Sequence, residues 1–415
     1  MPHHDRTYDF IIVGGGIVGA SFACALGDFA RRHSLRIGMI DSHRFDATSI
    51  PLCQTGEAFD PRVSAITAAS QQFLGDIGVW QDITAARVSP YTDMHVWDAD
   101  GTGSIHFSAV DINETELGHI IENSVILAAL YTRLEQLGHV ELIAPATVAT
   151  LERSEADQRV VIGLEDGREL SSTLLVAADG PASRTRKLAG IRTREWDYDQ
   201  SAIVTTVRSA TPHRATALQR FMATGPLAFL PLSGGDADGF VSSIVWSVET
   251  EKARQLMALN DEAFRGELAL AMERRRDDIQ WVDRRHCFPL RQRHAVDYVQ
   301  GRVVLIGDAA HSIHPLAGQG ANLGLSDARV LAAEVALVLN RGRPLSDPHL
   351  LRRYQRKRIG QNLGMMWLME GFKGLFAADA LPLRWLRNAG LRGMDRSGPL
   401  KHHVMRKAMG LDRRS

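Results

Sequence analysis

The chain has 415 residues, of which 45% are hydrophobic and 23% charged, so it holds enough apolar material for a large core and is not a disordered chain. Lysine plus arginine and aspartate plus glutamate both total 48, which excludes a general electrostatic attraction for nucleic acid. The three cysteines, Cys24, Cys53 and Cys287, form no CxxC pair and no metal-ligand spacing, which argues against a secreted disulfide framework and for a reducing compartment.

The N-terminal segment leads directly into an apolar run and lacks the charged region, apolar stretch and cleavage site of a signal peptide. No stretch of the sequence approaches the roughly 18 uninterrupted apolar residues of a membrane-spanning helix. We therefore expect a cytoplasmic protein, and any contact with the inner membrane face would be peripheral.

The first elements form one βαβ unit. Residues 9–13 are apolar and β-branched and predict a strand, residues 17–30 predict a helix, and residues 36–40 predict a second strand that ends at Asp41. Asp41 lies roughly twenty residues after the first turn, where an acid can accept hydrogen bonds from both ribose hydroxyls of a dinucleotide.

The turn between this strand and helix carries a G-x-G-x-x-G motif. Gly14 permits the turn, Gly16 lets the backbone approach a pyrophosphate, and Gly19 lets the helix lie close to the strand. Ile17 and Val18 open the helix, whose N-terminus attracts phosphate. Together with Asp41 the motif predicts dinucleotide binding, but this unit alone does not separate FAD from NAD.

Strands and helices alternate through the middle of the chain. Residues 122–137 predict an amphipathic helix, the segments 140–152 and 158–164 predict paired strands, and residues 173–177 predict a strand that closes at Asp179.

The character changes between about residues 198 and 300. Strands are expected at 202–207, 228–232 and 240–248, followed by a helical stretch over 250–272. We assign this region to a second, sheet-based domain.

A second glycine-rich turn follows the predicted strand 302–306. It contains Gly307-Asp308, and a carboxylate at a turn that closes a sheet can hold a ribityl hydroxyl. A run of small residues from His314 to Gly324 then leads into a helix predicted over 320–339, so that backbone amides can approach an electron-rich ring and a phosphate.

This run resembles the Gly-Asp motif of the flavin-dependent aromatic hydroxylases, the group that includes p-hydroxybenzoate hydroxylase, and more narrowly that of the ubiquinone-biosynthesis hydroxylases. The resemblance covers nearly the whole chain, with supporting stretches at 60–66, 121–123, 178–184, 229–232 and 243–247. It implies an α/β fold in which a Rossmann-like FAD-binding domain is interleaved with a β-sheet substrate domain and followed by a helical C-terminal tail.

The resemblance also implies a set of FAD-binding residues. Asp308 would bind the ribityl chain, Asp179 would belong to a motif associated with the pyrophosphate and with nicotinamide engagement, and Arg62 and Asn123 would lie near the flavin. The isoalloxazine would be wrapped by a ring-positioning loop and the start of the next helix, formed by Pro315, Leu316, Ala317, Gly318, Gly320, Ala321, Asn322 and Leu323.

The chemistry implied by the resemblance is carried by FAD. NAD(P)H or a redox protein would reduce the flavin, dioxygen would give a flavin hydroperoxide, and one oxygen atom would pass to a prenylated phenol. No catalytic side chain and no metal ion is required. His311 and His314 are therefore interpreted as structural, hydrogen-bonding residues rather than as proton-transfer groups.

Three alternatives stay open. A flavin halogenase would resemble its relatives in a WxWxIP motif, and no tryptophan here is followed two residues later by another. A prenyl reductase would consume NAD(P)H without dioxygen. A noncatalytic flavoprotein subunit of a quinone-biosynthesis complex would have no need of an intact ring-binding loop.

We predict a discontinuous FAD domain over 1–85, 110–190 and 300–372, a substrate domain over 86–109 and 191–299, and a tail over 373–415. Residues 384–415 carry nine lysines and arginines against only Asp395 and Asp412. Such a segment is typically a solvated helical face, and its apolar residues also fit an interfacial helix at anionic lipid.

Overall fold

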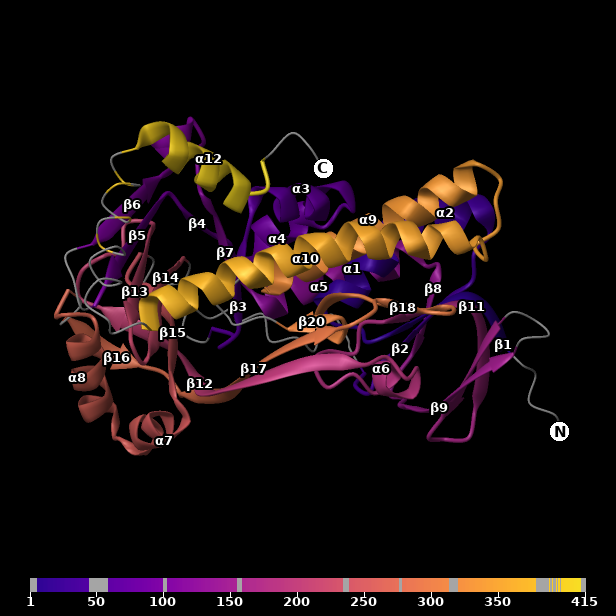
Figure 1. The fold of residues 1–415 in the computed structure, drawn as a ribbon, viewed down its shortest axis with the longest axis horizontal. Coiled ribbons are helices and arrows are strands. Elements are labelled where there is room, and N and C mark those ends of the chain that lie inside the picture. The colour runs from indigo at the N-terminus through magenta and orange to yellow at the C-terminus, as the bar shows by residue number, and fades with distance from the viewer. Residues whose placement is uncertain are drawn as a thin grey trace.

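The computed structural model describes residues 6–44, 59–99, 103–154, 159–233, 239–275, 278–312, 320–377 and 397–411, and in addition residues 388, 390, 393 and 395. The molecule is elongated, with two large sheets at opposite ends and the long helix α10 (Pro348–Ala377) running along most of its length (Figure 1). The α/β fold class expected from the sequence is confirmed.

The first sheet is a mostly parallel sheet that begins with the chain itself. Its strands lie in the order β18-β19-β11-β1-β2-β8, and β9 and β10 extend it in antiparallel fashion. Their bounds are β1 (Arg6–Val13), β2 (Ile37–Ile40), β8 (Val140–Ile143), β9 (Val148–Ser154), β10 (Arg159–Leu164), β11 (Glu169–Ala177), β18 (Val299–Gln300) and β19 (Val303–Leu305).

Helices cover this sheet because its central strands are apolar on both faces. Every residue of β2 and β19 is buried, as is typical of parallel strands between two helical layers. α1 (Ile17–Ala25) packs against both α5 (Asn123–Leu137) and α9 (Gly320–Asn340).

Three of the predicted elements are in fact divided. The helix expected over 17–30 ends at Ala25, and a second helix, α2 (Gly27–His33), begins at a glycine. The segment 140–152 forms two strands, β8 and β9, with Pro145, which has no amide hydrogen, between them. The stretch 250–272 forms α7 (Thr250–Ala258) and α8 (Asp261–Ala271), because Asn260 caps α8 by accepting a hydrogen bond from Ala263 N at 2.8 Å.

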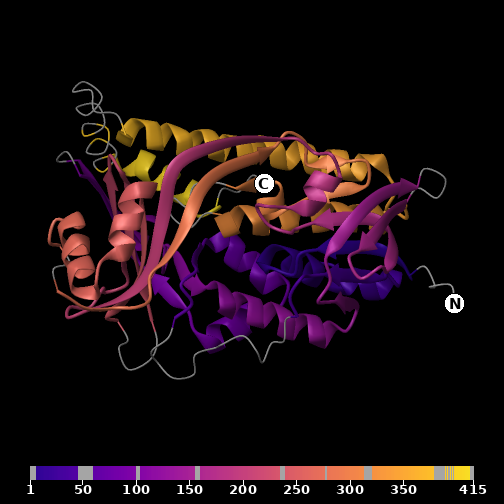
Figure 2. The ribbon, with the colours of Figure 1, turned by 90° about the horizontal axis from the view of Figure 1, so that it is seen from below.

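The second sheet is mostly antiparallel, in the order β20-β17-β12-β15-β14-β13-β5-β6, with β16 paired to β12. Its bounds are β5 (Asp93–Asp98), β6 (Ser104–Ser108), β12 (Thr193–Ser209), β13 (Thr216–Met222), β14 (Gly225–Leu232), β15 (Val241–Glu249), β16 (Ile279–Val282), β17 (His286–Ala295) and β20 (His311–Ser312). The long strands β12 and β17 sweep from this sheet toward the first (Figure 2).

A small third sheet, in the order β3-β7-β4, completes the strands. It contains β3 (Val63–Ile66), β4 (Ser89–Tyr91) and β7 (Gly118–Glu122). The division into domains stays a prediction. It places β4 in the substrate domain and β7 in the FAD domain, and these two strands pair with each other. The remaining elements are α3 (Ala68–Asp76), α4 (Trp80–Ala86), η1 (Ala109–Ile112), α6 (Arg184–Leu188), η2 (Gly307–Ala309) and α12 (Gly398–Ala408).

A buried ion pair ties the third sheet to the rest of the molecule. Glu122, at the end of β7, accepts hydrogen bonds from Arg87 Nε at 2.6 Å and Nη2 at 2.7 Å, and from Asp60 N at 2.7 Å. The Glu122 side chain is only 3% exposed, so its charge depends on these donors.

We expect Glu122→Ala to lower the free energy of unfolding by about 3 kcal/mol, because it leaves the largely buried guanidinium of Arg87 without its carboxylate. The matched control is Glu165→Ala, which removes a solvent-exposed pair with Arg184 and should cost less than about 1 kcal/mol. Urea unfolding measures both variants. Equal losses would contradict this account of the ion pair.

Candidate active site

Of the three glycines of the G-x-G-x-x-G motif after β1, two are tightly packed and one has open space beside it. Gly14 has φ +103°, and a β-carbon there would lie 2.3 Å from Ala178 O. A β-carbon at Gly19 would lie 2.0 Å from Gly14 O. Among the described residues, by contrast, no atom would lie within 4 Å of a β-carbon at Gly16, the N-cap of α1. The start of α1, where Ile17 and Val18 follow Gly16, therefore has open space beside it, as the close approach of a pyrophosphate requires.

Asp41 stands at the end of β2 beside this loop. Its Oδ2 accepts a hydrogen bond from Gly15 N at 2.7 Å and its Oδ1 accepts one from His43 N at 2.8 Å. The carboxylate also lines a cavity of about 450 Å³ together with Arg44 and Tyr131. Two backbone amides thus hold the acid in the wall of this cavity, beside the loop that is predicted to bind the dinucleotide.

The second glycine-rich turn packs directly against the first. A β-carbon at Gly307, where φ is +60°, would lie 3.1 Å from Val18 Cγ2, and one at Gly324 would lie 2.5 Å from the same atom. The β-carbon added at Gly324 would also lie 3.3 Å from Gly307 Cα. Two turns almost three hundred residues apart in the chain therefore meet around Val18.

Asp308 follows Gly307 in this turn. Protein surrounds its carboxyl on most sides, yet the residue reaches solvent. This desolvation raises the pKa of Asp308 above its ordinary value, while the nearby His311 lowers it and Asp327 raises it by smaller amounts. At this position the carboxyl of Asp308 can accept hydrogen bonds from a bound polyol or donate one to it.

A buried carboxylate lies under the turn. Asp327, on α9, accepts hydrogen bonds from Gly307 N at 2.9 Å and His311 Nε2 at 2.6 Å, and from two residues of α10, Arg358 Nε at 2.5 Å and Asn362 Nδ2 at 3.3 Å. Burial would raise the pKa of Asp327, but the charges and hydrogen bonds of His311 and Arg358 outweigh it and lower the pKa to about 2. The turn is therefore anchored by a permanent negative charge.

A buried arginine holds the same turn from the other side. Arg186 Nη1 donates to Ala309 O at 2.8 Å and its Nη2 donates to Pro181 O at 3.0 Å. Asp179 begins this segment, and its carboxylate accepts from Ser183 Oγ at 2.5 Å and from Thr185 N at 2.9 Å. The carboxylate of Asp179 thus orders the start of α6, and Arg186 links that segment to η2.

Asn123 and Asn322 meet at β3. Asn123 Oδ1 accepts from Ser64 Oγ at 2.7 Å, and Asn322 Nδ2 donates to Ala65 O at 2.7 Å. Asn322 Oδ1 also accepts from Thr67 N at 3.1 Å, so the side-chain amide of Asn322 is occupied by protein groups on both of its atoms. Arg62 is exposed, and its backbone carbonyl accepts a hydrogen bond from Asn123 N at 2.9 Å.

Gly320, Ala321 and Leu323 form the half-buried start of α9, and among the described residues no atom would lie within 4 Å of a β-carbon at Gly320. The loop residues Pro315, Leu316, Ala317 and Gly318, and also His314, lie outside the described residues.

Reasoning from the sequence missed the partners of the second glycine-rich turn, residues 307–309, which we call the flavin turn. These partners are all buried, with less than 8% of each residue exposed, and none belongs to a glycine-rich motif: they are Asp327, Arg358, Asn362 and Arg186. One signal was present, because Asp327 places a carboxylate on the apolar face of the helix predicted over 320–339. His311 does have the structural, hydrogen-bonding place that we expected for it.

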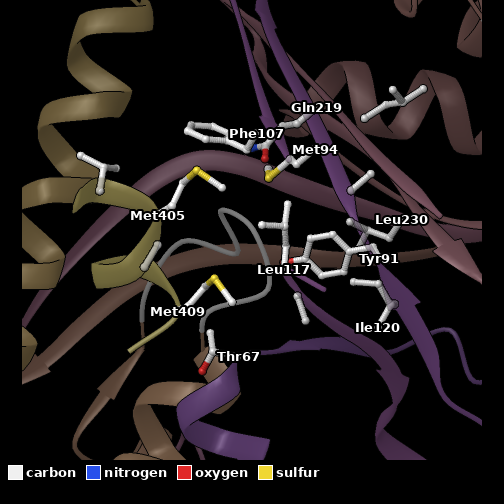
Figure 3. Close-up of a pocket in the computed structure, with 15 residues that line it drawn as sticks. Thr67, Tyr91, Met94, Phe107, Leu117, Ile120, Gln219, Leu230, Met405 and Met409 are labelled. Atoms are coloured by element: carbon white, nitrogen blue, oxygen red, sulfur yellow. The ribbon is translucent and has the colours of Figure 1, made fainter. Parts of the chain in front are cut away.

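An apolar cavity of about 160 Å³ lies beside this site, between the third sheet and the edge of the second (Figure 3). Thr67 and Ala65 form the wall nearest to Asn322, and Tyr91 and Gln219 contribute polar groups elsewhere. Burial raises the pKa of Tyr91 to about 12, so its hydroxyl keeps its proton at neutral pH. Most of the other lining residues are aliphatic, aromatic or methionine side chains.

A family model described as an FAD binding domain matches residues 7–363, which is most of the chain. The chain belongs to this family. This FAD-binding protein is 36% identical to the ubiquinone hydroxylase UbiL of Rhodospirillum rubrum, over 98% of this chain and 90% of that protein. It is 34% identical to the 3-demethoxyubiquinol 3-hydroxylase of Escherichia coli, over 98% of this chain and 100% of that protein.

The fold of this FAD-binding protein is also similar to that of p-nitrophenol 4-monooxygenase from Pseudomonas putida. The two align with a TM-score of 0.75 at 18% identity, over 99% of this chain and 100% of the other. The expected cofactor and enzyme class are thereby confirmed: this is a flavin-dependent monooxygenase that uses FAD, dioxygen, a reduced electron donor and an aromatic substrate.

The residues present fit FAD. The open face at Gly16 and the fixed carboxylate of Asp41 would hold the adenosine diphosphate portion, and Asp308 with the open start of α9 would hold the ribityl and ring portion. The individual residue assignments stay predictions.

The contact at Val18 can be tested with a double-mutant cycle. We expect Gly324→Ala to weaken FAD binding about tenfold, because the new methyl group collides with Val18 and separates the two turns. Val18→Ala in the same chain should restore much of that affinity. Fluorescence quenching of added FAD measures both variants. If the double variant bound FAD no better than Gly324→Ala alone, the two turns would not be coupled through Val18.

The buried charge of Asp327 predicts a pH effect. Its folded pKa of about 2 lies below the ordinary value of 3.8, so its stabilising effect is complete above about pH 4 and is lost as pH falls toward 2. Asp327→Asn should therefore unfold more easily than wild type by about 3 kcal/mol at pH 7, because Arg358 loses its carboxylate.

The difference between the two proteins should shrink as pH falls from 4 to 2. Urea unfolding at several pH values gives this difference directly and cancels the contributions of other groups. A difference that stayed constant over this range would show that folding does not lower the pKa of Asp327, and it would contradict this account.

Proposed function

We propose that this protein hydroxylates the aromatic ring of a prenylated ubiquinone precursor, with FAD, dioxygen and NAD(P)H or another electron donor. The observation that supports this most directly is the contact between the apolar cavity and the start of α9. Thr67 lines the cavity, and its N and Oγ1 lie 3.1 and 3.2 Å from Asn322 Oδ1 at the start of α9. A ring held in the cavity is thus one side chain away from the helix that would carry the flavin.

FAD, when bound, supplies the activation of dioxygen. The chain's own residues have the tasks of orienting the aromatic ring and excluding water. Phe107, Leu117, Ile120 and Leu230 make the cavity walls apolar, which disfavours water beside the ring. Thr67 and Tyr91 can hydrogen bond to a phenol oxygen, and the raised pKa of Tyr91 keeps it a donor at neutral pH.

The electron donor and the localisation follow from the same proposed function. NAD(P)H, or a redox protein, would meet the flavin transiently, because the sequence has no second G-x-G-x-x-G unit. We place the protein in the cytoplasm, with peripheral contact to the inner membrane or to a quinone-biosynthesis complex. Within the part of the chain that the structure describes, no helix has both the length and the apolar content to cross a bilayer.

The direct test supplies the purified FAD-loaded protein with NADH or NADPH, heavy-isotope dioxygen and a phenol that carries a short prenyl chain. We expect mass spectrometry to find a product with one labelled oxygen atom on the ring. Ala217→Leu, which narrows the cavity, should lower kcat/KM about tenfold and leave FAD content unchanged. Donor oxidation without a labelled product would contradict the proposed hydroxylation and favour a reductase.

A further inference from the structure

One wall of the apolar cavity is made by the C-terminal helix. Val404, Met405, Ala408 and Met409 line it, and their spacing places them on one face of α12 and its end. Figure 3 shows Met405 and Met409 reaching from this helix toward Met94, Phe107 and Leu117 on the opposite side. A helix far from both glycine-rich turns in the sequence therefore completes the cavity.

Among the described residues of the cavity lining, Ala408 is the one that is exposed to solvent. Met405 and Met409 are 4% and 6% exposed and close the wall, whereas Ala408 lines the cavity and is also exposed to solvent. The small side chain of Ala408 therefore separates the cavity from solvent at this position, which we call the mouth. This mouth lies on α12, away from the side of the cavity where Thr67 contacts Asn322.

An apolar stripe leads away from the mouth along the helix surface. Leu400, Val404 and Ala408 follow one another at intervals of four residues and therefore share a face of α12. Leu400 is 51% exposed, which is unusual for so large an apolar side chain. The stripe is continuous with the cavity through Val404 and Ala408, which belong to both.

Polar contacts around its rim hold α12 in this place. Lys401 Nζ lies 2.8 Å from Asp111 Oδ2, Arg406 Nη2 donates to Ile112 O at 3.2 Å, and Ala69 N donates to Met409 O at 3.2 Å. These contacts tie the start, middle and end of the helix to η1 and α3. The position of the mouth is therefore a property of the folded structure.

The size of the cavity limits what it can hold. A cavity of about 150 Å³ accommodates a benzene-sized ring, and this one measures about 160 Å³. A ring that bears a long chain cannot be enclosed entirely. Its chain has to leave the cavity, and Ala408 is the lining residue that is exposed to solvent.

We propose that α12 forms the substrate mouth, so that the ring lies in the cavity while its long apolar chain passes Ala408 and lies along Val404 and Leu400. Residue 408 then determines whether the long chain of the proposed prenylated phenol is accepted. This inference rests on the proposed function, because it places the same aromatic substrate.

The test compares two phenols with one ring, of which the first bears a methyl group and the second a long isoprenoid chain. Equilibrium binding is followed by the absorbance change of the bound flavin, without an electron donor. Ala408→Phe narrows the mouth at an exposed position, and His403→Phe is the matched control on the same helix, exposed and outside the cavity lining.

We expect Ala408→Phe to raise the Kd of the long-chain phenol at least about tenfold more than that of the methyl phenol. His403→Phe should change neither. A second variant, Leu400→Glu, should also weaken only the long-chain phenol, because it puts a charge on the stripe at a position outside the cavity lining.

Two results would overturn the inference: Ala408→Phe weakens both phenols equally, or it weakens neither. Both leave the proposed function intact, since wild type still binds the ring. If wild-type protein with its full FAD content bound neither phenol, the proposed function itself would fail. FAD content and unfolding midpoint, measured on every variant, separate these outcomes from misfolding.

Discussion

The flavin turn depends on one buried carboxylate. Asp327 is fully buried, yet it keeps its charge because Gly307, His311, Arg358 and Asn362 all donate hydrogen bonds to it. A buried charge with fewer partners would be strongly destabilising, so this arrangement forms as a whole or not at all. Through these donors a single side chain on α9 sets the positions of η2, β20 and α10.

Arg186 completes this constraint from the opposite side. Asp327 holds the amide of Gly307, and Arg186 holds the carbonyl of Ala309, so both ends of the three-residue element η2 are fixed by buried charged groups. Asp308 lies between these two points. Its carboxyl can therefore stay accessible without losing its position, which is what binding a cofactor's hydroxyl groups requires.

The cavity for the aromatic ring is built in the opposite way, from shape and apolar surface. Its walls come from seven strands and from α12, which are far apart in the sequence, and only a few polar groups reach it. The hydrogen bonds of Asn322 to Ala65 and Thr67 join the cavity to the flavin turn. Rigid polar anchoring on one side and an adaptable methionine-rich wall on the other divide the tasks of holding a cofactor and admitting a substrate.

The sequence by itself determined the fold class, the FAD cofactor and the hydroxylase family, because the glycine motifs and Asp41 report local backbone geometry that few residues can adopt. It also indicated most of the strands and helices, although Pro145 and Asn260 divide two of them where periodicity alone suggested one. Only the tertiary structure decided that Asp327 meets Arg358, that Arg186 reaches Ala309, and that α12 closes the cavity. These contacts join residues that are distant in the chain. The sequence does not show which charged side chains are buried, because burial depends on how the elements pack.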